Sequence, residues 1–392
     1  MLIVSSEPHS VRSPTPSPKS VGANLSSSSR EAEPTEVLST DIRGVRTKPS
    51  GGSREVGSTE VLSTDITYVS WQAALKDSVR DPRELCRILE LPPADADQAL
   101  AAARDFPLFV PRSFVARMQK GDAGDPLLRQ VLPLADELES PQGYLKDPVG
   151  DQQATLRPGL LHKYHGRVLM VATGACAVHC RYCFRRHFPY TSTPRSPAEW
   201  EPALAVIAQD DSLREVILSG GDPLMIVDEH LAELAGNLAD VKHLRRLRVH
   251  TRLPIMIPER VTDELVAWLC GTRLTPIVVV HVNHPAEIDR PVAATLQRLT
   301  HAGIMVLNQA VLLRGVNDTA DTLVELCEKL VDLRIAPYYL HQLDPVLGAA
   351  HFEVPVAEGK RLMAELRRRL PGYAVPRYVR EVAGAASKLP LE

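Results

Sequence analysis

The pattern of apolar and polar positions divides the chain into stretches of different character. Residues 1–67 contain no Phe, Tyr or Trp and are rich in Ser, Thr, Pro, Glu and Gly. Such a stretch cannot bury enough apolar surface to offset the cost of ordering the chain. We therefore expect a disordered tail. Within it, the sequence TEVLSTDI at 35–42 occurs again at 59–66, a local duplication that is too short and too polar for a repeat architecture.

Helical periodicity begins at residue 68. Apolar residues recur every three to four positions in 71–75 and 81–91, and the second run opens with Asp81 followed by Pro82. Aspartate is a preferred helix N-cap, and proline is favoured in the first helical turn. The pattern predicts a small helical domain over residues 68–150.

Beyond residue 150, strand-like apolar runs alternate with amphipathic helices such as 228–241 and 318–333. The strand-like runs are 167–173, 215–219, 247–252, 276–283, 304–312 and 335–343. This alternation is typical of parallel strands joined by helical crossovers. Six strands are too few for a closed eight-stranded barrel. We predict an α/β protein with an open (β/α)6 partial barrel over 151–345, a C-terminal segment over 346–392, and functional residues at the ends of the strands.

Composition narrows the possible partners and the cellular compartment. The 45 basic and 48 acidic residues give a net charge of -3, which offers no general attraction for nucleic acid or an anionic membrane. No run approaches the roughly 20 apolar residues of a membrane span, and the first four residues are too few for a signal-peptide core. Six cysteines, three of them clustered, do not form a disulfide framework. We expect a cytoplasmic protein, with Cys86, Cys270 and Cys327 filling the core.

The other three cysteines form a CxxxCxxC motif directly after the first predicted barrel strand: Cys176, Cys180 and Cys183. An iron–sulfur cube normally takes one thiolate on each of its four irons, so three cysteines leave one iron open to another ligand. This spacing is typical of radical S-adenosylmethionine (SAM) enzymes. A tetrahedral zinc site completed by His179 or His187 is the alternative.

The next predicted strand favours the cluster over zinc. It is followed by Gly220, Gly221 and Asp222, which place bare backbone and a carboxylate at the carboxyl end of a strand, where barrel enzymes hold their chemistry. A zinc site accounts for none of these residues.

Several motifs together resemble the lysine 2,3-aminomutase family of radical SAM enzymes, from about residue 68 to the C-terminus. They are LLHKYHGR at 160–167, the cysteine motif, SGGDPL at 219–224, NQAVLLRGVND at 308–318, HQLDPVLGAAHF at 341–352 and SKLP at 387–390. Within the family, the chain most resembles the subgroup that makes β-lysine for elongation factor P. That closer likeness lies in VPRSF at 110–114, DPLLRQVL at 125–132, RYCFRRHFPY at 181–190, and RE at 380–381 with SK at 387–388.

The resemblance implies an isomerase that converts L-α-lysine into (R)-β-lysine with a [4Fe–4S] cluster, SAM and pyridoxal 5′-phosphate (PLP). The three cysteines would hold the cluster, and SAM would chelate its open iron. The residues expected around SAM are Tyr182, Gly220, Gly221, Asp222, His281 and Gln309. Of these, Tyr182 would pack on adenine, and Asp222 would pair with the SAM ammonium group.

The same resemblance assigns the PLP and substrate residues. Lys388 would form the imine with PLP, although its lead-in at 383–387 has one glycine where the family is glycine-rich. Lys163 and Arg167 would hold the anionic groups of PLP.

Substrate choice would rest on charge. Arg185 would bind the amino acid carboxylate, and Asp344 and Glu381 would receive a distal ammonium group. Expected partners are L-lysine, an electron donor and, through the pathway, elongation factor P and its lysyl ligase. Open alternatives are a catabolic free-lysine or other amino acid 2,3-aminomutase, and a non-catalytic iron–sulfur or zinc-binding interaction module. A glutamate enzyme would require a cation in place of Asp344 and Glu381.

Overall fold

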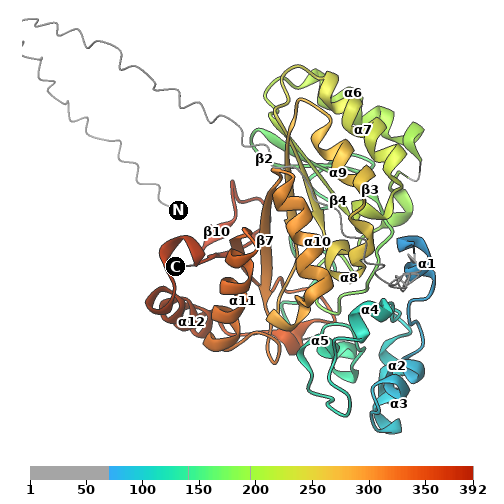
Figure 1. Ribbon diagram of the computed structural model, residues 1–392, viewed down its shortest axis with the longest axis vertical. Coiled ribbons are helices and arrows are strands. Elements are labelled where there is room, and N and C mark those ends of the chain that lie inside the picture. The colour runs from blue at the N-terminus through green and yellow to red at the C-terminus, as the bar shows by residue number, and fades with distance from the viewer. Residues whose placement is uncertain (1–69, 140, 195, 392) are drawn as a thin grey trace, which may run out of the picture. The chain divides into compact units, whose positions relative to one another are not determined.

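A ten-stranded sheet organises the computed structural model, which describes residues 70–139, 141–194 and 196–391 (Figure 1). The predicted disorder of 1–67 and the duplicated sequence lie outside the described residues. The strands are hydrogen-bonded in chain order from β1 to β10. Each strand therefore lies beside its neighbour in sequence, as expected for successive crossovers.

The six predicted strands are all present and successively parallel. They are β3 (Arg167–Thr173), β4 (Glu215–Gly220), β5 (Arg246–Thr251), β6 (Thr275–Val280), β7 (Met305–Leu312) and β8 (Ala336–Gln342). Strand β6 ends three residues before the predicted boundary at 283. The chain leaves the sheet there because the backbone N–H of Asn283 donates to the Glu287 carboxylate instead of to a neighbouring strand.

Four further strands extend the sheet at its two edges. Antiparallel β1 (Thr155–Arg157) and β2 (Leu160–Tyr164) precede β3, while β9 (Arg377–Arg380) is parallel to β8 and β10 (Leu389–Pro390) is antiparallel to β9. No pairing joins β1 or β2 to β9 or β10 among the described residues. The prediction of an open barrel is confirmed, although the sheet has ten strands among the described residues and the prediction gave six.

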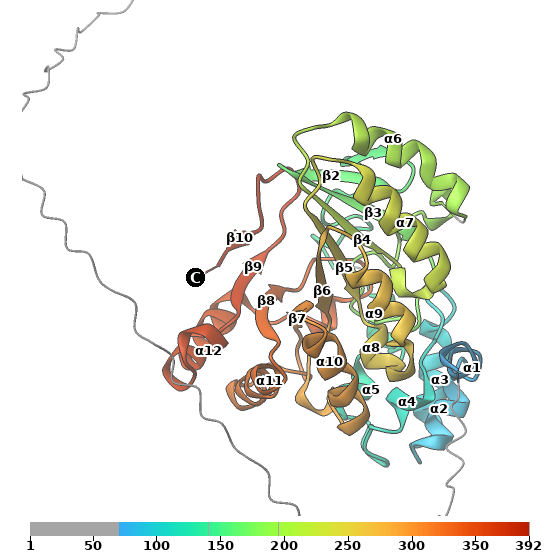
Figure 2. The same cartoon turned by 45° about the horizontal axis from the view of Figure 1, so that its top comes forward.

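Helices cover the outer face of the parallel strands (Figure 2). They are α6 (Glu201–Gln209), α7 (Asp228–Asp240), α9 (Asp263–Cys270), α10 (Arg290–His301), α11 (Ala320–Asp332) and α12 (Val356–Arg369). In α7, the buried residues are Leu231, Leu234, Ala235 and Leu238. Their spacing is that of one helix face, so the apolar stripe read from the sequence is the face that packs on the sheet.

Short helices precede the barrel, in the region where the sequence analysis expects a helical domain (68–150), whose bounds stay a prediction. They are α1 (Trp71–Lys76), α2 (Pro82–Ile88), α3 (Pro93–Ala102), α4 (Arg112–Val115) and α5 (Pro126–Arg129). One cluster of buried apolar residues runs from Trp71 and Phe114 in this region to Val216 and Val278 in the barrel. The helical region and the barrel therefore share one apolar core.

Two of the three remaining cysteines fill the core, as expected. Cys86 and Cys327 are buried, whereas Cys270 is exposed. The expectation was wrong for Cys270 because it is the last residue of α9, where the helix reaches the surface. Within the described ranges, no helix is long and apolar enough to cross a membrane.

A buried ion pair ties α7 to the chain segments around it. Asp228 accepts hydrogen bonds from Arg260 at 2.9 and 3.0 Å and from the Trp268 indole at 2.9 Å. Arg260 is fully buried and also donates to the carbonyl of Leu224. Removing Asp228 would leave a buried cation without its counter-charge.

Asp228→Ala should therefore destabilise the protein by about 3–5 kcal/mol, the usual cost of removing one partner of a buried ion pair. Urea unfolding measures the change. Asp263→Ala is the matched control, because Asp263 also begins a helix but pairs with Arg298 at the surface. The control should cost less than about 1 kcal/mol, and equal losses for the two variants would contradict the prediction.

Candidate active site

A cavity of about 860 Å³ opens inside the barrel. All fifteen residues expected at the site line it: Lys163, Arg167, Cys176, Cys180, Tyr182, Cys183, Arg185, Gly220, Gly221, Asp222, His281, Gln309, Asp344, Glu381 and Lys388. Most of them follow the carboxyl ends of strands, the part of a barrel that carries function. Gln309 was expected at a strand end but lies within β7.

The cysteine loop is held by the chain segment that precedes the barrel. The backbone N–H of His179 donates to the carbonyl of Phe109, and that of Arg181 donates to the carbonyl of Gln130, both at 2.9 Å. The buried Arg181 guanidinium binds both carboxylate oxygens of Glu137. These contacts hold the cysteine loop in place without using the cysteine side chains.

Gly220 and Gly221 allow the next loop to approach the cysteine loop closely. A Cβ atom on Gly220 would overlap the carbonyl oxygen of Thr173, and one on Gly221 would overlap that of Ala175. Gly220 also has a φ of +127°, a conformation that residues with a Cβ rarely adopt. The backbone N–H groups of Gly221 and Asp222 donate to these two carbonyls at 2.8 and 2.7 Å.

The carboxylate of Asp222 binds the protein's own groups. It accepts hydrogen bonds from the backbone N–H groups of Leu224, Arg252 and Leu253, and from the Thr251 hydroxyl. Asp222 therefore joins the loop after β4 to the loop after β5. Burial raises the pKa of this carboxyl, which its hydrogen bonds partly offset.

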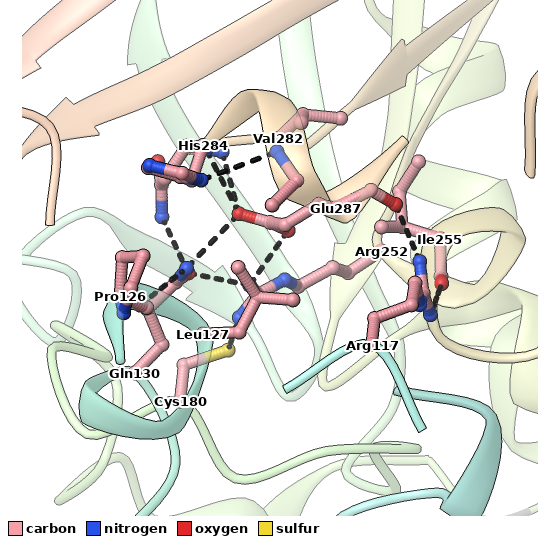
Figure 3. Close-up of polar contacts among 12 residues, drawn as sticks. Arg117, Pro126, Leu127, Gln130, Cys180, Arg252, Ile255, Val282, His284 and Glu287 are labelled. Atoms are coloured by element: carbon pink, nitrogen blue, oxygen red, sulfur yellow. Dashed lines mark hydrogen bonds and ion pairs between the residues drawn. The ribbon is translucent and has the colours of Figure 1, made fainter. Parts of the chain in front are cut away.

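A buried polar network packs behind Cys180 (Figure 3). Arg252 donates from Nη1 to the Cys180 sulfur at 2.8 Å, and from Nη2 to Gln130 Oε1 at 2.6 Å and to Glu287 at 3.1 Å. Gln130 in turn donates to the Glu287 carboxylate at 3.0 Å. The Arg252 guanidinium thus links Cys180 to Gln130, which lies before the barrel, and to Glu287 in the loop after β6.

Tyr182 belongs to the same network. Its hydroxyl donates to Gln130 at 3.3 Å and accepts from the Asn283 amide at 2.7 Å. The sequence analysis identified Tyr182 but missed Gln130, Arg252, Asn283 and Glu287. Arg252 and Asn283 are polar residues at the ends of predicted strands, and that position was the available signal.

The motif cysteines are the metal ligands that the sequence analysis expects, and two of their thiols must lose protons before they bind a metal. Burial raises the pKa of Cys176 well above its ordinary value, and that of Cys183 to about 11. Among the described residues, no three His, Cys, Asp or Glu side chains converge as a single metal ion requires. A cube presents a different iron to each thiolate, so the cysteines need not converge.

A chain of alternating charges crosses the cavity wall. Asp151 lies 2.6 Å from both Arg185 and Lys163, Lys163 lies 2.9 Å from Glu381, and Glu381 pairs with Lys388. Burial alone would raise the pKa of Glu381, but the lysines outweigh it and lower that pKa to about 2. The sequence analysis did not identify Asp151, which joins two of the predicted residues.

The Oδ1 atom of Asp344 is buried without a hydrogen-bond partner among the described residues. Asp344 differs from Asp151, whose Oδ1 also accepts no hydrogen bond but lies 2.6 Å from the Lys163 ammonium group. Burial, and then the nearby charge of Glu381, raises the pKa of Asp344 to about 7. A ligand cation beside this oxygen would supply the missing interaction.

Neutral imidazoles line another part of the cavity. The Gln309 amide lies 2.7 Å from His281 Nε2 and 3.5 Å from His250 Nδ1. Burial lowers the pKa of His281 to about 3, and it also lowers the pKa values of His250 and His341 well below their ordinary value. His250 and His341 also line the cavity, but the sequence analysis did not select them.

Arginines line the cavity near the amino ends of the strands. Arg167 begins β3, with its guanidinium 4.8 Å from the Tyr164 ring, and Arg248 and Arg377 also contribute to the lining. This part of the wall suits a phosphate group, because guanidinium groups bind phosphate in a forked geometry. Lys163, which the sequence analysis paired with Arg167 at this site, already forms ion pairs with Asp151 and Glu381.

Comparison with known proteins agrees with this geometry. Residues 170–330 match the model of the radical SAM superfamily. L-lysine 2,3-aminomutase of Escherichia coli is 47% identical over 82% of this chain and 94% of its own length. The Haemophilus influenzae protein of the same name is 45% identical over 81% and 94%. The chain belongs to the lysine 2,3-aminomutase family.

Membership of that family of radical SAM enzymes makes the protein an isomerase. It also implies a [4Fe–4S] cluster and SAM, which fit the three motif thiols and the cavity that they line. Similarity extends more weakly to L-lysine 2,3-aminomutase of Clostridium subterminale, at 33% identity over 82% of this chain and 77% of that protein.

Gly221→Ala should lower the iron content of the reconstituted protein, because the added methyl group would displace the backbone of the cysteine loop. Iron analysis and the visible absorbance of the cluster measure the effect. Gly236→Ala is the control, since a Cβ there meets nothing within 4 Å. Full iron loading of the Gly221 variant would show that the loop can move without losing the cluster.

Proposed function

We propose that the enzyme converts L-lysine into β-lysine, with the substrate held between Arg185 and the Asp344–Glu381 pair. The observation that carries this proposal is the buried, unpartnered oxygen of Asp344. A buried acceptor without a partner is costly, and a substrate ammonium group would satisfy it. Arg185 lines the same cavity and can bind a carboxylate. Lysine carries both groups at opposite ends.

PLP is part of the proposal, with Lys388 as its covalent anchor and Arg167 among the residues that hold its phosphate. Lys388 lines the cavity, and its partner Glu381 keeps it close to the proposed substrate position. A primary amine in an enclosed site is the group that a PLP enzyme requires. When bound, SAM and the reduced cluster supply a radical that removes hydrogen from the substrate, and PLP carries the migrating amino group.

The residues of the chain then bind, orient and shield the substrate. Arg185 would hold the carboxylate, and Asp344 and Glu381 would hold the distal ammonium group. Tyr182, Asp222, His281 and Gln309 would form the wall for SAM beside the three cysteines. This enclosure excludes water and fixes the reacting carbon. A glutamate substrate would place a third carboxylate beside Asp344 and Glu381.

The finer biological assignment is that (R)-β-lysine is supplied in the cytoplasm to elongation factor P through its lysyl ligase. Its support is the set of subgroup motifs, such as DPLLRQVL at 125–132.

The decisive experiment is anaerobic incubation with SAM, PLP, a reductant and L-lysine, followed by chiral mass spectrometry. The proposal requires (R)-β-lysine, and L-glutamate in a parallel incubation should remain unchanged. A variant with Cys176, Cys180 and Cys183 all replaced by Ala is the control and should form no product. Consumption of glutamate with lysine untouched would refute the substrate assignment.

Lysine affinity should rise with pH through about 7, because Asp344 must be ionised to bind an ammonium group and its pKa is raised to about 7. Below that pH, binding must expel a proton, so the dissociation constant should increase by up to about tenfold per pH unit. Calorimetry without SAM measures it. Asp344→Asn should weaken binding and remove this pH dependence, and a wild-type affinity that is flat across this range would contradict the prediction.

Lys388→Ala should abolish aminomutation and the absorbance of protein-bound PLP while the cluster remains, because the cysteine loop is a separate segment of the chain. Borohydride reduction and peptide mapping test the anchor in the wild type. The pyridoxyl mass should lie on the peptide containing Lys388. Its appearance on Lys163 would move the anchor to β2.

A further inference from the structure

Asp151 lies between two cations in the cavity wall. It is 1% exposed, and its oxygens Oδ2 and Oδ1 lie 2.6 Å from Arg185 Nε and from Lys163 Nζ, respectively. The backbone around it is also fixed. Its N–H donates to Asp147 at 2.9 Å, and its carbonyl accepts from the Thr155 hydroxyl at 2.9 Å. The carboxylate is therefore built into the site.

The charge state of Asp151 suits this position. Burial alone would raise its pKa, but Arg185 and then Lys163 outweigh that effect and lower it. The carboxylate is therefore ionised over the range in which the neighbouring cations are charged. Two cations that would otherwise repel one another are held on either side of it.

Arg185 is oriented by these contacts. Asp151 takes its Nε, the Ser219 hydroxyl accepts from Nη1 at 3.2 Å, and the guanidinium lies 4.8 Å from the Phe184 ring. The second terminal nitrogen, Nη2, makes no hydrogen bond with the residues that the structure describes. Two of the three guanidinium nitrogens are thus held by the protein, and the terminal nitrogen Nη2 is left for a ligand.

We propose that Asp151 is a positioning residue that holds Arg185 in the orientation required to bind the substrate carboxylate. The inference rests on the proposed function, because it takes an amino acid carboxylate as the ligand of Arg185. Asp151 lies outside the motifs that identify the family in this chain. It acts at the carboxylate end of the substrate, while Asp344 and Glu381 act at the ammonium end.

Asp151→Asn tests this assignment because it keeps the shape of the side chain and removes its charge. Wild type and variant are reconstituted anaerobically with cluster and PLP but without SAM, so that no turnover occurs. Calorimetry then measures the affinity for L-lysine and for cadaverine, which has the two amino groups of lysine but no carboxylate. The variant should bind L-lysine at least about tenfold more weakly, as expected when a buried charge-assisted contact is lost. It should bind cadaverine as the wild type does.

Two further variants separate positioning from folding. Asp81→Asn also neutralises one carboxylate, but Asp81 caps α2 and does not line the cavity, so this variant should leave L-lysine affinity near that of the wild type. Asp151→Glu should recover part of the lost affinity. Iron content should be the same in all variants, which shows that each protein is folded.

Unchanged L-lysine affinity in Asp151→Asn would overturn the inference. So would an equal loss for L-lysine and cadaverine, because it would show that Asp151 does not act through the carboxylate. Failure of the wild type to bind L-lysine would instead refute the proposed function, so the two ideas fail by different results.

Discussion

Charge buried in a low-dielectric interior must be paired, and this constraint orders the whole cavity wall. An unpaired buried ion costs several kcal/mol, yet this barrel holds arginine, lysine and carboxylate side chains together. Arg185 is matched by Asp151, Arg181 by Glu137 and Arg252 by Glu287. Each pair fixes the direction of a long, flexible side chain, so the polar interior is also rigid. Asp344, whose Oδ1 has no partner among the described residues, breaks this pattern.

The chain segment before the barrel belongs to the same system. Gln130 is fully buried and contacts Arg252, Glu287 and Tyr182. Its own carbonyl accepts the backbone N–H of Arg181. Gln130, which caps the C-terminus of α5, thus contacts the cysteine loop and the loops after β5 and β6. The short helices act as a scaffold that orders the cysteine loop before any ligand arrives, which lowers the cost of binding.

The sequence predicted the parallel strands from two patterns: β4 and β6 are nearly continuous apolar runs, as expected for strands buried on both faces, whereas β5 and β7 alternate between buried and less buried positions. It did not predict β1 or β10, because β1 is wholly exposed and β10 has two residues. The cysteine motif was readable from spacing alone. Lys388 was not, since a lysine near a chain end is ordinarily solvated, and only the family resemblance brought it forward.

Two of the residues that the sequence analysis missed share one property. Asp151 and Arg252 are single charged residues whose partners are distant in sequence: Arg185 is 34 positions from Asp151, and Gln130 is 122 positions from Arg252. A lone charged residue in a sequence usually indicates a solvated surface. These two residues are buried because the strands bring together loops that are far apart in the sequence. Their burial therefore cannot be predicted from the residues next to them.

The open edge of the sheet gives the barrel a seam made of side chains. Lys163 on β2 and Glu381 after β9 meet across it at 2.9 Å, while no backbone ladder joins these strands within the described residues. Parting the seam would therefore break ion pairs and leave every ladder hydrogen bond intact. The side chains of Lys163 and Glu381 are only 18% and 14% exposed, so dissolved salt screens this pair much less than it screens a surface pair. The wall beside Lys388 can thus yield without unfolding any strand, and its firmness depends on the charges of two mostly buried side chains.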